Sequence, residues 1–285
     1  SGRTASGGLG SPSARYRVTA GRAATTAVRD RIAADLVDLG LTQGEAVLVH
    51  SSLRSIDHGG RGAGVVVEAL KDVIGPEGTL VVPTQTADNS TTSPHFRAAT
   101  RALSDEQVAR YRAAMPGFDP ATTASSGMGA LAEYVRTLPD AVRSTHPQTS
   151  FAAVGAHAEA LTTVHALECH LGEDSPQGSM YRLDASVLLL GVGYDKCTAF
   201  HLAEYRYRRS APKRRYECVV RSQGRNEWIT FQDLDLDDSD FTALGARFEA
   251  EFGVVSQRVL GAVTRLFPLR AAVDFAVPWF TEHRG

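Results

Sequence analysis

Three short apolar runs along the chain predict strands that are buried on both faces of a sheet. They occupy residues 46–50, 79–83 and 186–190 and are rich in Val and Leu. Between the first two runs, apolar residues recur at helical spacing over residues 65–73. The order strand, loop, helix, strand is that of a parallel βαβ unit, so the pattern predicts an α/β fold.

The other periodic segments complete the predicted element list. Residues 89–126 show weak periodicity and are expected to cross the surface as a long excursion that shapes a substrate site. Helices are expected at residues 26–39, 104–115, 129–138, 156–161, 176–183, 241–252 and 257–266. Strands are expected at residues 151–154, in a hairpin of residues 216–221 and 227–231, and at 274–280 as a closing strand or packed tail.

Composition narrows the class of protein without naming an activity. The 285 residues suit one large domain or two small ones. The net charge of -2 gives no reason to expect nucleic acid or an anionic membrane surface as a partner, and no apolar run approaches the roughly 20 residues of a membrane span. Residues 1–24 are expected to be a disordered or vector-derived segment, followed by a single domain at residues 25–285.

The cysteines point to a reducing cytoplasm. The chain has three, widely spaced, which fits neither a disulfide framework nor a zinc motif. Cys197 lies near the candidate site described next and is interpreted as a small buried residue, with a nucleophile as the alternative.

The candidate chemistry follows the third apolar run. A Gly-X-Gly turn ends that strand, and His201 and Glu204 follow three residues apart. If Thr198 opens a helix, this spacing places the imidazole and the carboxylate on one face. A carboxylate beside an imidazole favours one tautomer and stabilises the protonated ring, as a general base requires. The alternative is a surface helix whose polar face happens to carry both residues.

Two charged or glycine-rich segments allow more than one interpretation. The glycines at residues 59–64 precede a predicted helix and suit either an anion site or a flexible turn. The acidic cluster at residues 233–240 lacks the spacing of a calcium-binding EF-hand, so it predicts contact with a cationic small molecule or simple solvation.

Four motifs in order resemble one known family. The sequence resembles the aminoglycoside 3-N-acetyltransferases, coenzyme A-dependent antibiotic acetyltransferases distinct from the GNAT fold. The motifs are Val-His-Ser-Ser-Leu at residues 49–53, residues 78–86, Arg-Ser-Thr-His-Pro at residues 143–147 with Ser150 and Gly155, and His-Leu-Ala-Glu at residues 201–204. The resemblance implies an α/β fold with a central mixed β-sheet and helices on both faces.

The resemblance also implies roles for individual residues. It implies acetyl transfer from acetyl-coenzyme A directly to the 3-amino group of an aminoglycoside, without a metal. His201 would be the general base, Glu204 would orient it, and Thr198 or nearby groups would stabilise the oxyanion. The residues implied to line the coenzyme side are Ser51, Ser52, Leu53, His146 and Ser150.

A polycationic substrate implies carboxylates around it, and the candidates are Asp88, Glu204, Asp233 and Asp235. Two alternatives to the aminoglycoside reaction remain: an acetyltransferase for another small biosynthetic amine, and a non-catalytic coenzyme A-binding protein. The protein is expected to be cytoplasmic and a monomer or homodimer.

Overall fold

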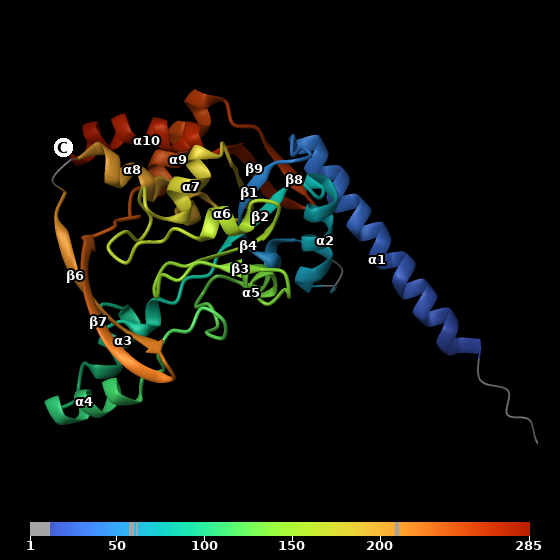
Figure 1. The fold of residues 1–285 in the computed structure, drawn as a ribbon. Helices are drawn as coiled ribbons and strands as arrows, with labels where there is room; N and C mark the ends of the chain where they lie inside the picture. The colour runs from blue at the N-terminus through green and yellow to red at the C-terminus, as the bar shows by residue number, and fades with distance from the viewer. Residues whose placement is uncertain (1–11, 57–59, 61, 209–210) are drawn as a thin grey trace, which may run out of the picture.

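A mixed β-sheet forms the centre of the molecule (Figure 1). The computed structural model describes residues 12–56, 60, 62–208 and 211–285. Within them, a seven-stranded sheet has the order β3-β4-β2-β1-β5-β9-β8, with β1 parallel to β2 and β5 and every other pairing antiparallel. The strands are β1 (Ala46–Ser51), β2 (Thr79–Pro83), β3 (Val142–Arg143), β4 (Phe151–Gly155), β5 (Ser186–Leu190), β8 (Ser256–Val259) and β9 (Ala262–Pro268).

Helices cover both faces of this sheet, as predicted. On β1, Val47 and Val49 pack against one set of helices, while Leu48 packs against the other, because successive strand side chains point to opposite faces. The first set is α1 (Pro12–Leu39), α2 (Gly62–Ile74) and α5 (Ala130–Arg136). The second is α6 (Ala158–Thr162), α7 (Pro176–Arg182), α8 (Phe200–Tyr207), α9 (Phe241–Phe252) and α10 (Leu269–Arg284).

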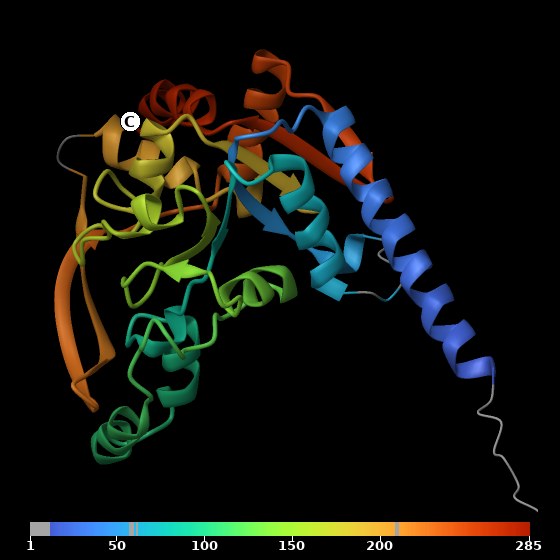
Figure 2. The ribbon, with the colours of Figure 1, turned by 45° about the vertical axis from the view of Figure 1, so that its right-hand side comes forward.

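Helix α1 begins earlier than predicted. Residues 1–11 lie outside the described residues. Residues 12–24, expected to be disordered or vector-derived, are helical, and the N-terminal end of α1 extends away from the body (Figure 2). The predicted start near Thr26 was wrong because the Thr25 and Thr26 hydroxyls do not cap a helix. They donate to the carbonyls of Gly21 and Arg22, one turn back in the same helix.

The C-terminal third differs most from the sequence-based assignment. Residues 257–266, predicted as a helix, form the β8–β9 hairpin, in which Leu260 and Gly261 both have positive φ, at 42° and 86°. Two such residues make the tight turn that favours a hairpin. The segment 274–280, predicted as a strand or packed tail, lies inside α10 and buries Ala276 and Phe280 on the sheet.

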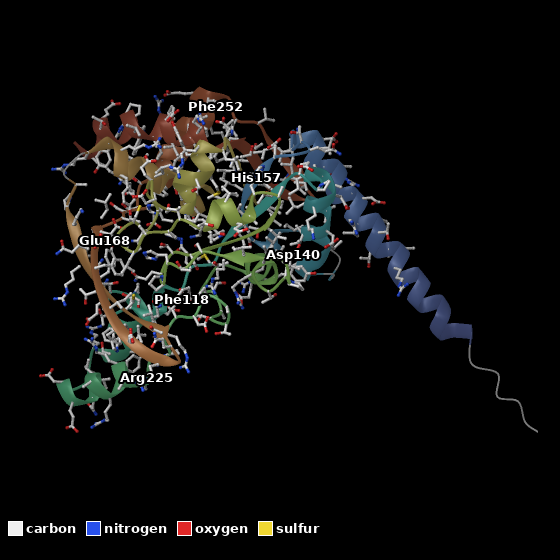
Figure 3. The ribbon with its side chains drawn as sticks, in the orientation of Figure 1. Phe118, Asp140, His157, Glu168, Arg225 and Phe252 are labelled. Carbon is white, nitrogen blue, oxygen red and sulfur yellow. The ribbon has the colours of Figure 1, made fainter. Side chains whose placement is uncertain are left out.

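A second substructure lies beside the main sheet. It consists of the segment 89–126 packed against the predicted hairpin. Strands β6 (Lys213–Ser222) and β7 (Arg225–Leu234) form that hairpin, and α3 (Pro94–Thr100) and α4 (Asp105–Ala114) lie against it. Phe118 pairs with Val220 in an isolated bridge. Figure 3 shows Phe118 and Arg225 on this side of the molecule, away from Phe252. Within the described residues, no helix is both long and apolar enough to span a membrane.

Candidate active site

A cavity of about 710 Å³ opens where the parallel strands β1 and β5 end. This edge is where α/β sheets ordinarily bind ligands, since the loops leaving neighbouring parallel strands diverge there. Gly191 has a φ of +70°, and a Cβ at this position would lie 2.8 Å from that of Ser55, so only glycine lets the two loops approach closely. The lining includes residues 49–54, Pro83, Gln85, residues 127–130, Ala132, Val192, residues 195–198, His201, Asp238 and Phe241.

His201 contributes an imidazole that is held on one side and faces the cavity on the other. It lies in the first turn of α8, and its Nδ1 is 2.5 Å from Oε2 of Glu204. The side chain of His201 is 13% exposed and that of Glu204 is 6% exposed. The ring of Phe241 packs against the imidazole at 4.7 Å between centroids. Because Nδ1 is bound to the carboxylate, Nε2 is the nitrogen left to meet a ligand.

Glu204 is held in turn by two further donors. Its Oε1 accepts from the backbone N–H of Asp237 at 3.0 Å and from Nη1 of Arg284 at 2.5 Å. Burial lowers the pKa of Arg284, but hydrogen bonds to the carboxylates of Asp240 and Glu204 outweigh this and raise it, so the guanidinium stays charged. Both oxygens of the buried Glu204 carboxylate therefore have hydrogen-bond partners, which offset the cost of burying its charge.

A second polar group at the cavity is centred on Thr198. Its Oγ1 accepts from Nε2 of Gln177 at 2.6 Å and lies 3.3 Å from Nε2 of His50. Burial, and secondarily the charge of His201, lowers the pKa of His50 to about 3. His50 is therefore neutral near pH 7. The Thr198 hydroxyl accepts from Gln177, and its single proton is available to a ligand in the tautomer in which His50 donates from Nε2.

The structure brings several residues predicted from the sequence together. Ser51, Ser52 and Leu53 leave β1 and line the cavity, and Thr198 and His201 line it from the opposite loop. Their contacts with a coenzyme or an oxyanion stay predictions. Glu204, predicted also to touch the substrate, lies behind His201 with both oxygens occupied, so the direct substrate contact was wrong.

His146 and Ser150 do not line the cavity, and the structure gives them structural roles instead. His146 is 1% exposed, and its Nε2 lies 3.1 Å from the Leu167 carbonyl. Ser150 is fully buried and bonds with the side chains of Thr84 and Arg143. The prediction that they lie on the coenzyme side of the cavity was wrong, because the loop after β3 turns inward under the β6–β7 hairpin.

The predicted substrate carboxylates are scattered. Asp233 is 2% exposed and accepts from His170, Tyr205 and the backbone N–H of Leu234, so it cannot meet a substrate. Asp235 is on the surface and pairs with Arg214 at 3.1 Å, and Asp88 accepts from Ser126. None of these three lines the cavity among the described residues.

Other residues of the site were not identified from the sequence. Asp238, from the same acidic cluster, is exposed and does line the cavity. His50, Gln177 and Arg284 come from distant parts of the chain. In the sequence, His50 gave a weak indication of a functional role, because it is a polar residue near the end of a buried strand. Gln177 and Arg284 gave no such indication. Among the described residues, no group of three or more His, Cys, Asp or Glu side chains could hold a metal ion.

The comparisons with known proteins decide the family. A family model described as aminoglycoside 3-N-acetyltransferase matches residues 48–281. The chain belongs to the aminoglycoside 3-N-acetyltransferase family. The fold is therefore of the antibiotic N-acetyltransferase type and not GNAT, and the chain is an acyltransferase, as predicted from the four motifs. Acetyl-coenzyme A is the co-substrate of this family.

Individual members of the aminoglycoside 3-N-acetyltransferase family resemble the chain over nearly its whole length. It is 38% identical to the aminoglycoside N(3')-acetyltransferase-like protein YokD of Bacillus subtilis, over 90% of this chain and 93% of that protein. It is 34% identical to aminoglycoside N(3)-acetyltransferase III of Pseudomonas aeruginosa, over 88% and 94%. The crystal structure of YokD superposes with a TM-score of 0.83, at 37% identity over 90% and 94% of the two chains. The AAC-IIIb structure with CoASH superposes with 0.78, at 28% identity over 90% and 96%.

Proposed function

We propose that this acetyltransferase moves the acetyl group of acetyl-coenzyme A directly to the 3-amino group of an aminoglycoside, with His201 as general base. One observation carries the proposal: His201 lines the cavity with Nε2 free, while Glu204 fixes Nδ1 at 2.5 Å. Related proteins that share 34% identity are named aminoglycoside N(3)-acetyltransferases, which supports the choice of acceptor.

The reaction needs a group that removes a proton from the acceptor. A free alkylammonium resembles that of lysine, with a pKa of roughly 10.4, and only the neutral amine attacks a thioester. In the proposed step, the ammonium has first lost one proton to solvent, and the neutral amine attacks the carbonyl carbon while Nε2 of His201 takes a second proton from the nitrogen. The carbon–sulfur bond then breaks, and the imidazolium returns the proton to the thiolate of coenzyme A. Glu204 stabilises the imidazolium between these two steps.

The groups around His201 suit the two substrates. The oxyanion of the tetrahedral intermediate needs hydrogen-bond donors, and the Thr198 hydroxyl supplies one when Gln177 and the Nε2–H of His50 both donate to its oxygen. Arg54 adds positive charge to the lining for a phosphorylated donor, whereas Lys196 is paired with Asp195 at 3.0 Å. Asp238 adds a carboxylate for a cationic acceptor.

Cys197 is poorly suited to the alternative of a covalent nucleophile. Its side chain is fully buried, and burial raises the pKa of the thiol to about 12. The reactive thiolate is therefore scarce at neutral pH, and direct transfer needs no covalent enzyme intermediate.

Replacing His201 by Ala tests the base. We expect turnover to fall at least roughly a hundredfold while acetyl-coenzyme A binding, measured by calorimetry, stays close to wild type, because the lost group acts on the acceptor proton. Turnover within roughly threefold of wild type would show that His201 is not the base. Cys197→Ala is the matched control from the same loop and should keep wild-type turnover.

An acetylation screen tests the acceptor. Thiol release would be followed with a panel of aminoglycosides, amino sugars and simple diamines, and mass spectrometry would locate the modified nitrogen. Acetylation at the 3-amino group of an aminoglycoside is expected. Transfer only to another small amine would favour a biosynthetic acetyltransferase. If no amine in the panel causes thiol release, a non-catalytic coenzyme A-binding protein would be favoured.

A further inference from the structure

Arg284, in the last turn of α10, reaches the back of the proposed catalytic pair. Its Nη1 donates to Oε1 of Glu204 at 2.5 Å, and its Nη2 donates to the backbone carbonyl of Asp237 at 2.7 Å. Its Nε donates to Asp240 at 2.7 Å. One guanidinium thus joins α10, α8 and the loop before α9 within a single hydrogen-bonded group.

The surroundings of Arg284 hold it in one place. The side chain is 13% exposed, and its guanidinium carbon lies 3.9 Å from the ring centre of Phe280, one turn earlier on the same helix. Asp240 offers both oxygens to it, which fixes the plane of the guanidinium. A donor fixed in this way can define where the Glu204 carboxylate lies.

The carboxylate of Glu204 requires such a donor. The terminal torsion of a glutamate is broad, so the plane of the carboxylate is set by its partners and not by the side chain itself. Arg284 and the Asp237 N–H both bind Oε1, and this leaves Oε2 for Nδ1 of His201. With Arg284 absent, the carboxylate would keep a single donor on that side and could turn away from the imidazole.

We propose that Arg284 is a positioning residue for acetyl transfer, which acts on His201 by fixing the plane of the Glu204 carboxylate. The proposal rests on the proposed function, in which His201 is the base. Residue 284 lies beyond the span 48–281 that the family model matches. Sequence spacing gives no hint of it, because 80 residues separate Arg284 from Glu204.

The charge of Arg284 adds a second, measurable effect. The charged or titratable groups facing His201 are Glu204 on its own helix, His50 from β1, Asp237 and Asp238 before α9, and Arg284 behind Glu204. Removing the positive charge of Arg284 makes the protonated imidazole more favourable. The acid side of the rate profile should therefore move to higher pH if the Glu204 carboxylate stays on Nδ1 and to lower pH if it turns away, whereas a purely structural contact would lower the rate equally at every pH.

Substitutions on α10 provide the test and its control. Arg284→Gln is expected to lower kcat roughly tenfold or more, with KM for acetyl-coenzyme A within roughly threefold and the acid midpoint displaced from that of the wild type. Arg284→Lys, which retains the charge, should recover most of that loss. Arg270→Gln is the matched control, since Arg270 lies on the same helix and pairs with Asp184 at 2.7 Å, away from Glu204; it should leave kcat and the pH profile unchanged.

A double-mutant cycle with Glu204→Gln decides whether Arg284 acts through Glu204. If it does, Arg284→Gln will cost little further activity once Glu204 has lost its charge. Additive losses, or an Arg284→Gln enzyme that matches the Arg270→Gln control, would overturn the proposal. If Arg284→Gln does not fold, Arg284→Met, which also removes the charge and the donors, takes its place in the cycle. Failure of the proposed function itself is recognised separately, by a His201→Ala enzyme that keeps its turnover.

Discussion

Two histidine–carboxylate pairs with nearly equal nitrogen–oxygen distances occur in this molecule. One of them lines a cavity, and the other is buried in the protein interior. In one, His201 and Glu204 are 2.5 Å apart, and in the other, His170 and Asp233 are 2.6 Å apart. The first lines the large cavity through the imidazole, while both side chains of the second are at most 5% exposed.

The His170 pair has no free polar atom directed at a ligand. Nε2 of His170 lies 2.9 Å from the side-chain oxygen of Gln148, and its ring packs against both Tyr216 and Phe231 at 4.4 and 5.4 Å between centroids. Asp233 also accepts from the hydroxyl of Tyr205. The same pair of groups is thus a structural tie in one place and a candidate base in the other. Access to a cavity, and not pairing, separates the two.

Substitution of the two histidines should separate stability from activity, with the largest effects expected here. We expect His170→Asn to lower the free energy of unfolding by roughly 3 kcal/mol, because it leaves Asp233 buried with fewer donors. The folded enzyme should keep kcat within roughly threefold. His201→Asn should instead lower kcat strongly and leave the free energy of unfolding close to that of the wild type. Urea unfolding and steady-state rates on the same preparations check this, and a large loss of kcat in folded His170→Asn would break the distinction.

The histidines packed around His170 should make the protein sensitive to acid. Burial, more than neighbouring charge, lowers the pKa of His146 well below its usual range, and burial lowers the pKa of His165 to about 4. Between about pH 6.5 and 4, the unfolded chain therefore binds a proton at His165 that the folded protein does not. Stability falls as the pH drops through this window, by roughly 1.4 kcal/mol per pH unit for each such histidine.

Unfolding midpoints at pH 7 and pH 5 measure this sensitivity. His165→Gln should flatten the acid slope, while His283→Gln should leave it unchanged, because that side chain is exposed. An equal slope in His165→Gln and wild type would show that other groups cause the acid loss.

The smallest expected effect concerns the carboxylates near each pair. Asp238 lines the cavity beside His201, and Asp235 lies on the surface two residues from Asp233, paired with Arg214. Asp238→Asn should raise KM for a polycationic amine by roughly fivefold at low salt, since an exposed charge contributes about 1 kcal/mol at most. Asp235→Asn should not change it. Equal effects of the two substitutions would place the acceptor elsewhere.

Local patterns predicted much of the fold. The buried strands β1, β2 and β5 follow from continuous apolar runs, and α7 follows from Ser175 and Pro176 at its start. The β8–β9 hairpin was assigned wrongly as a helix, and the strand alternative for residues 274–280, which lie in α10, was also wrong. In the first, a turn with positive φ at Leu260 decides the structure, and in the second, packing of Ala276 and Phe280 on the sheet decides it. Apolar residues alone do not distinguish these cases.

The acidic cluster shows the same limit within the site. Asp233, Asp235 and Asp238 are similar in sequence, yet one is buried, one pairs on the surface and one lines the cavity. Which carboxylate meets the cavity depends on how β7 ends and α9 begins, and therefore on packing that no short window of sequence contains.

The sequence by itself determined the His201–Glu204 pair, because residues three apart on one helix meet wherever that helix lies. Only the tertiary structure decided that this pair faces a cavity while His170 and Asp233 do not. It also decided that Thr198 accepts a hydrogen bond from Gln177 and that Glu204 accepts one from Arg284. Those contacts join segments 21 and 80 residues apart. They exist because burial of the apolar faces of the sheet and its helices brings their polar ends together.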